Sequence, residues 1–173
     1  RDPDVAFAGS EYLVAWVDDP SGGTFKNVYV RRLAADGTAV GAARTPIATT
    51  SDPEREPVIA TDGTSFLVAY QRDRTSVTRD VYGATVSAAG VAGTPFPIAA
   101  YADNQFEVDV AAGGGKYLVA FVDDHALSSY DVVAARVTSA GVVEDPSGVA
   151  IATSLHSEWS PLGCAGDTTS LFL

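Results

Sequence analysis

The strongest constraint on this chain is that it repeats itself. Three segments with the same apolar character, Tyr-Leu-Val-Ala-Trp at 12–16, Phe-Leu-Val-Ala-Tyr at 66–70 and Tyr-Leu-Val-Ala-Phe at 117–121, align without a gap. Their first aromatic residues lie 54 and 51 residues apart, and a truncated copy at 170–173 follows after another 54. A fixed period near fifty residues is typical of folds in which one structural unit stacks on the next.

The segments on either side of each aromatic segment recur as well. The preceding segments are 1–12, 55–66 and 106–117, and the following segments, each ending in glycine, are 27–37, 80–90 and 131–141. We therefore divide the chain into repeats 1–54, 55–105 and 106–159 and a partial repeat 160–173. Because every part recurs in the same order, each repeat is expected to fold in the same way.

Within one repeat the apolar pattern has the period of a β-strand. Val28 and Val30 alternate with Tyr29 and Arg31, and β-branched and aromatic residues predominate. The segment 12–17 is apolar on both faces, as in a strand buried between two layers. Glycines that end the following segments supply the positive φ of tight hairpin turns. The pattern predicts four strands in each repeat.

Four short antiparallel strands repeated at this period indicate a β-propeller of three four-stranded blades and part of a fourth. The competing all-β architecture is a β-sandwich, which gives no reason for repeats in fixed register. Propellers close with about four to eight blades. We therefore expect a segment of a larger ring, completed by further blades of the same polypeptide or by self-association.

Composition excludes several classes of partner. The 173 residues carry a formal net charge of −11, which disfavours nucleic acid and anionic lipid. Apolar runs fall short of the roughly 20 residues that cross a bilayer, so membrane insertion is not expected. One cysteine, Cys164, allows neither an internal disulfide nor a Cys-x-x-Cys zinc site. The acidic charge and the absence of methionine suit an exported protein, so we expect an extracellular or cell-surface location.

The repeats resemble those of bacterial extracellular proteins with β-propeller-type units. The resemblance rests on the Tyr-Leu-Val-x-Trp strand at 12–16, the Asn-Val-Tyr-x-x-Arg strand at 27–32 and the Asp36-Gly37 turn, with equivalents in the other repeats. The third repeat departs from the pattern, with Val133-Ala134 where Tyr-Gly is expected. The resemblance implies a secreted scaffold or adhesion-like module and assigns no activity.

Carboxylates recur in the loop between the second and third strands of each repeat. If these loops lie on one rim of a propeller, their oxygen atoms could bind Ca²⁺, the one cofactor that the sequence suggests. The alternative is that these side chains bond to their own turn backbone. The candidate metal ligands are Asp18, Asp19, Asp73, Asp80, Asp123, Asp124 and Asp131.

Three aromatic residues outside the strand pattern, Phe25, Tyr130 and Trp159, are candidates for contacting a ligand at the rim. Trp16 instead takes the place of Tyr70 and Phe121 in the repeat, so we expect it in the core between units.

The sequence contains no recognisable catalytic signature. We therefore expect a non-catalytic binding or scaffold module that contacts protein or glycan through its rim loops. The alternative is a segment of a propeller hydrolase, glycosidase or sialidase-like, whose remaining site residues lie outside this chain.

Overall fold

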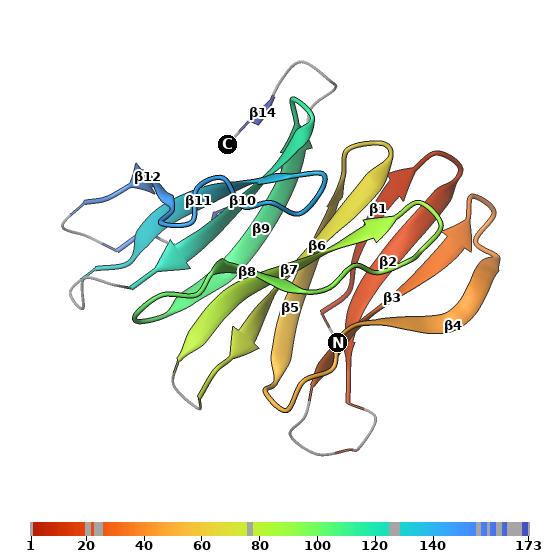
Figure 1. Cartoon of the computed structure of the whole chain (residues 1–173), viewed down its shortest axis with the longest axis horizontal. Coiled ribbons are helices and arrows are strands. Elements are labelled where there is room, and N and C mark those ends of the chain that lie inside the picture. The colour runs from red at the N-terminus through yellow and green to blue at the C-terminus, as the bar shows by residue number, and fades with distance from the viewer. Residues whose placement is uncertain are drawn as a thin grey trace.

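The computed structural model describes residues 2–19, 22, 26–75, 78–124, 129–154, 157–158, 160–161, 164–165 and 171–172. Its regular structure consists of three four-stranded antiparallel sheets, side by side in chain order, and one pair of short strands (Figure 1). The predictions of an all-β fold and of four strands in each full repeat are confirmed.

Consecutive strands pair within each sheet. Sheet 1 comprises β1 (Asp4–Ala8), β2 (Glu11–Asp18), β3 (Asn27–Ala34) and β4 (Ala39–Ala48). Sheet 2 comprises β5 (Glu54–Thr61), β6 (Ser65–Asp73), β7 (Arg79–Ser87) and β8 (Phe96–Ala99). Sheet 3 comprises β9 (Gln105–Gly113), β10 (Lys116–Asp123), β11 (Asp131–Thr138) and β12 (Val149–Ala152). The separate pair is β13 (Cys164–Ala165) and β14 (Leu171–Phe172).

The turns between the third and fourth strands are those that the repeat predicts. Gly37, Gly90 and Gly141 have φ values of 84°, 78° and 81°. This left-handed backbone is open to glycine at little cost and is unfavourable for most other residues. Each turn therefore depends on its glycine.

The core lies between the sheets. Leu13, Ala15 and Val17 of β2 pack in one buried cluster with Phe66 and Tyr70 of β6. The opposite face of β6 packs in the same manner against β10 of sheet 3. Because sheet 2 is covered on both sides, every residue of β6 from 66 to 71 is buried. This explains why the middle strand reads as a continuous apolar run.

Sheet 1 has one face that no other described sheet covers. On that face Val5, Phe7 and Tyr12 are 53%, 47% and 37% exposed. Trp16 lies there too and is only half-buried, whereas Phe121 at the equivalent position is fully buried. Within the described part of the chain no second sheet covers Trp16, so the expectation that it lies in the core between units stays a prediction.

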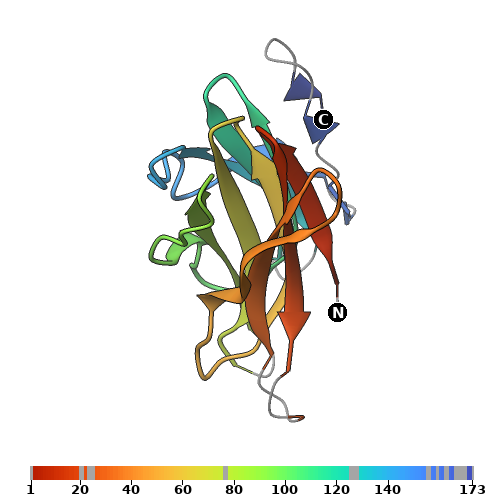
Figure 2. The ribbon, with the colours of Figure 1, turned by 90° about the vertical axis from the view of Figure 1, so that its right-hand side faces the viewer.

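The first strands of the sheets lie close together. β5 contacts both β1 and β9, while the last strands β4 and β8 lie at the opposite edges of their sheets. Seen from the side, the long strands run along the length of the molecule, so most connections gather at its two ends (Figure 2). β1, β5 and β9 therefore form the inner edge of the arrangement. None of the described residues forms a helix that could span a membrane.

Candidate functional site

The inner strands share a backbone irregularity: a non-glycine residue with positive φ at or just before the start of the strand. Asp2, Glu56 and Glu107 occupy the same repeat position, and Ser160 lies one residue before that position in the partial repeat. Their φ values are 48°, 47°, 50° and 52°. In sheets 2 and 3 the pairing of the inner strand with its neighbour shifts register at this point. Such bulges redirect a side chain, and strained residues of this kind cluster at functional sites.

Three of these four residues are carboxylic acids, which makes the inner edge the best candidate for chemistry. These three acids are not among the site residues expected from the sequence. The signal was available, since Asp2 of Arg-Asp-Pro, Glu56 of Arg-Glu-Pro and Glu107 of Phe-Glu-Val align. A shared acidic position is ordinary in a strand, and only the positive φ sets it apart.

The inner carboxylates bond to neighbouring strands. The Glu107 Oε2 atom accepts hydrogen bonds from the backbone N (2.8 Å) and Oγ (3.1 Å) of Ser160. Asp4 Oδ2 accepts one from the backbone N of Ile59 in sheet 2, at 2.8 Å. Glu56 Oε2 accepts a hydrogen bond from Gln71 Nε2. Asp4 and Glu107 thus join neighbouring repeats, whereas Glu56 bonds within sheet 2. Glu56 and Asp2 remain exposed to solvent.

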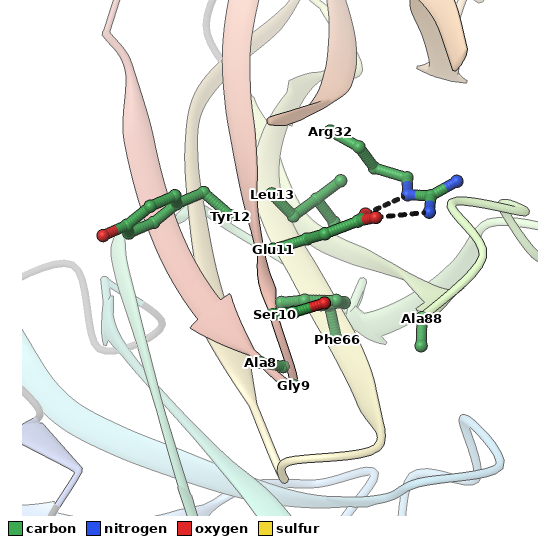
Figure 3. Close-up of a pocket in the computed structure, with 9 residues that line it drawn as sticks. All are labelled: Ala8, Gly9, Ser10, Glu11, Tyr12, Leu13, Arg32, Phe66 and Ala88. Carbon is green, nitrogen blue, oxygen red and sulfur yellow. Dashed lines mark hydrogen bonds and ion pairs between the residues drawn. The ribbon is translucent and has the colours of Figure 1, made fainter. Parts of the chain in front are cut away.

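A pocket of about 160 Å³ lies between sheets 1 and 2. Figure 3 shows Glu11 and Arg32 facing each other on its wall, with the Tyr12 ring pointing away from them. The Arg32 Nε and Nη2 atoms hold the Glu11 carboxylate at 2.6 and 3.0 Å. The pocket is smaller than most small-molecule sites, and its two charges neutralise each other. Its ion pair is better suited to joining strands than to holding a ligand.

The candidate metal ligands of sheets 1 and 2 pair with arginines. Asp18 lies 2.5 Å from Arg44. Asp73 lies 2.6 Å from Arg55, and Asp80 lies 3.0 Å from Arg74. Burial raises the pKa of Asp80, and Arg74 acts in the opposite direction. Asp19 directly follows β2.

The candidates of sheet 3 have a different environment. Asp124 accepts hydrogen bonds from the backbone N and the Nδ2 of Asn104, both at 2.7 Å. Asp123 and Asp131 are buried and paired in register on β10 and β11. In the described part of the chain, no group of three or more histidine, cysteine, aspartate or glutamate side chains is arranged to hold a metal. The calcium prediction stays a prediction.

Of the candidate ligand-binding aromatics, Tyr130 is half-buried and packs edge-on against Phe106, with ring centroids 5.5 Å apart. Phe25 and Trp159 lie outside the described residues.

Solved structures with a similar fold include several glycoside hydrolases of the β-propeller type. The chain is similar to the GH93 α-L-arabinofuranosidase of Fusarium graminearum in complex with arabinobiose (TM-score 0.62, 13% identity, 87% of this chain and 49% of that one). It is also similar to the α-L-arabinanase of Penicillium chrysogenum complexed with arabinobiose (TM-score 0.57, 13% identity, 94% and 54%). A third similar structure is the endo-arabinase of Bacteroides thetaiotaomicron (TM-score 0.56, 11% identity, 87% and 60%).

The chain thus spans about half the length of the solved structures that it matches. At these identities the likeness establishes a propeller-like fold and nothing finer. No protein-family model matches the chain, and no curated protein matches it.

Proposed function

We propose that this chain forms three blades of a glycan-recognising β-propeller and that the complete propeller is a glycoside hydrolase. The observation that carries the proposal is the likeness of the three sheets to arabinan-degrading enzymes over most of the chain. This reverses the order of the two functions expected from sequence, because no comparison favours a module without activity.

The proposed chemistry requires two carboxylic groups on either side of the scissile bond, one as acid and one as base or nucleophile. The inner edge offers Glu56 and Glu107 at the bulged starts of β5 and β9, and Asp2 just before β1. Glu56 is the strongest of these candidates because its side chain is exposed, whereas Glu107 is half-buried and bonded to Ser160. Further site residues would come from blades outside this chain.

A non-catalytic binding or scaffold module is the second candidate, and one observation favours it. Glu107 and Asp4 already accept hydrogen bonds from backbone amides of neighbouring inner strands. Inner strands are sheet edges whose free N–H groups need acceptors. On this view the inner carboxylates fasten the blades together and do not reach a substrate.

The uncovered face of sheet 1 supports the further proposal that another blade completes the ring. Phe66 and Tyr70, equivalent to Tyr12 and Trp16, are covered by sheet 1. A blade from the same polypeptide or from a second copy would cover Tyr12 and Trp16 in the same way. Light scattering distinguishes them, since a monomeric mass excludes the second copy. Export to the cell exterior remains part of the proposal.

The functional proposal is tested with linear arabinan, using affinity electrophoresis for retention and the release of reducing ends for hydrolysis. Glu56→Gln and Glu107→Gln are the test variants, and Glu144→Gln, a surface carboxylate paired with Lys116, is the control. Loss of a catalytic carboxylate should lower the rate about 10²- to 10⁴-fold. Retention without hydrolysis would favour the binding module. If arabinan is neither retained nor hydrolysed, the glycan-recognising proposal is contradicted, and a scaffold module that binds no arabinan is favoured.

A further inference from the structure

Gln71, near the end of β6, is a polar residue at a position that is apolar in the other two sheets. The equivalent residues of β2 and β10 are Val17 and Val122. Gln71 is completely buried, with 0% of its surface exposed. An amide in such a place costs stability unless its polar atoms are hydrogen-bonded. Sheet 2 therefore carries an amide where the other sheets use a hydrocarbon side chain.

The amide group of Gln71 is directed at Glu56 on the neighbouring strand β5. Its Nε2 atom donates a hydrogen bond to Glu56 Oε2, whereas its Oε1 atom is buried and accepts none. A carboxylate only accepts hydrogen bonds, so the amide must turn its nitrogen toward Glu56 and leave its own oxygen without a donor. A buried oxygen in this state is destabilising. Holding Glu56 therefore costs sheet 2 some of its stability.

Glu56 is the acid that this bond orients. It is exposed, has a φ of 47° and stands where the pairing of β5 with β6 shifts register. Non-glycine residues with such a φ are strained and persist only where the surrounding structure holds them. The bond from β6 thus fixes one carboxylate oxygen of a residue that stays exposed at the inner edge.

The equivalent acid of sheet 3 is held in a different way. There the residue equivalent to Gln71 is Val122, which has no donor to offer. The Glu107 Oε2 atom instead accepts hydrogen bonds from the backbone N and the Oγ of Ser160 in the partial repeat. Glu107 is half-buried and joined to another repeat, whereas Glu56 is oriented by a side chain of its own sheet.

We propose that Gln71 is a positioning residue for Glu56: it holds the carboxylate in one orientation at the inner edge, where a glycan would bind. The inference rests on the proposed function, and it assigns the acting acid of this chain to sheet 2 and leaves Glu107 as a link between repeats. Departures from a stabilising pattern are expected at functional sites, and the buried amide of Gln71 is such a departure.

The test uses two variants of Gln71. Gln71→Val copies the other sheets, and Gln71→Leu keeps the side-chain volume, so that a cavity does not mask the effect. Both remove the donor to Glu56 together with the unpaired oxygen. We expect Tm of Gln71→Leu to rise by roughly 2–4 °C. In both variants kcat on linear arabinan should fall about 10- to 100-fold with little change in KM, because the acid is no longer aligned.

Gln105→Leu is the matched control. Gln105 is also buried and its Oε1 atom also accepts no hydrogen bond. Its Nε2 atom donates to Asp123 Oδ1 and to the carbonyl oxygen of Ala102, both at 3.1 Å, rather than to an inner carboxylate. Replacing it should lower Tm, because a buried carboxylate loses a donor, and should leave kcat unchanged. A glutamine with a purely structural role is thus distinguished from one that positions an acid.

A measurement without substrate separates this inference from the proposed function. The side-chain ¹⁵N–¹H NMR signals of Gln71 are followed between about pH 7 and pH 3, where carboxylates gain protons. They should shift as Glu56 is protonated, because a neutral carboxyl group is a weaker acceptor, and the shift should be lost in Glu56→Gln.

The outcomes are distinct. If the wild-type chain leaves arabinan intact, the proposed function is overturned, and the NMR signals and Tm then decide whether Gln71 positions Glu56. The inference itself is overturned if the Gln71 signals do not follow Glu56, if Gln71→Leu lowers Tm, or if an active wild-type chain keeps its kcat in both Gln71 variants.

Discussion

Arg32 of sheet 1 donates a hydrogen bond from Nη1 to the carbonyl oxygen of Ala89 in sheet 2, at 2.8 Å. The same guanidinium holds Glu11 through its other two nitrogen atoms. One side chain therefore links two strands of its own sheet to a turn of the next sheet.

Removing this link should weaken the junction between sheets 1 and 2. Arg32→Ala is expected to lower the free energy of unfolding by about 1–2 kcal/mol, since charge-assisted hydrogen bonds are lost at a partly buried site. Arg44→Ala is the control, because its pair with Asp18 is exposed and stays within sheet 1; it should cost less than about 1 kcal/mol. Urea denaturation measures the loss of unfolding free energy in both variants. Equal losses would contradict a stabilising role for the hydrogen bond from Arg32 to the Ala89 carbonyl oxygen.

Two equivalent turns differ in what surrounds their glycine. Gly37→Ala places a side chain at a φ of 84° with open space around it, so backbone strain of about 1–2 kcal/mol is the expected cost. Gly141→Ala has similar strain and also places Cβ 2.9 Å from Phe96 Cε1. Its loss of stability should be clearly larger. Equal losses in denaturation would mean that the Phe96 ring moves aside freely.

Burial raises the pKa of Glu54, and hydrogen bonds from Thr50 act in the opposite direction. A pKa raised above the unfolded value means that the charged form opposes folding, so this group favours the fold at low pH and loses that effect as the pH rises. Glu54→Gln, which copies Gln105, should therefore raise Tm at pH 7, and the gain should vanish below about pH 4. Thermal melts from pH 3 to 8 give the profile. The surface variant Glu144→Gln should show no such pH-dependent gain in Tm. A gain for Glu54→Gln that is independent of pH would contradict burial of the charged carboxylate as the cause.

Phe121 and Trp16 occupy the same repeat position and differ in burial. Phe121→Ala removes a fully buried ring between sheets 2 and 3 and should cost about 3–5 kcal/mol. Trp16→Ala should cost far less in the isolated chain, because Trp16 is half-buried on the uncovered face. If denaturation shows the two losses to be equal, a second copy or another blade covers sheet 1 in solution.

Much of the fold could be predicted from local chemistry. The apolar period of two places Leu13 and Ala15 on one strand face, and glycine at position 37 fixes a turn wherever the repeat places it. The candidate site was harder to predict from the sequence. Glu56 stands in an ordinary strand sequence, and its positive φ arises where the pairing of β5 with β6 shifts.

The sequence by itself determined the strands, their order, their turns and their repetition, because these depend on alternation and on glycine within a few residues. Only the tertiary structure decided which equivalent residues of the three repeats have the same surroundings. Asp80 and Asp131 are equivalent in the repeat, yet one lies beside arginines and the other beside a second carboxylate. Burial and charge depend on neighbours from other strands and sheets, and a repeat pattern does not specify those neighbours.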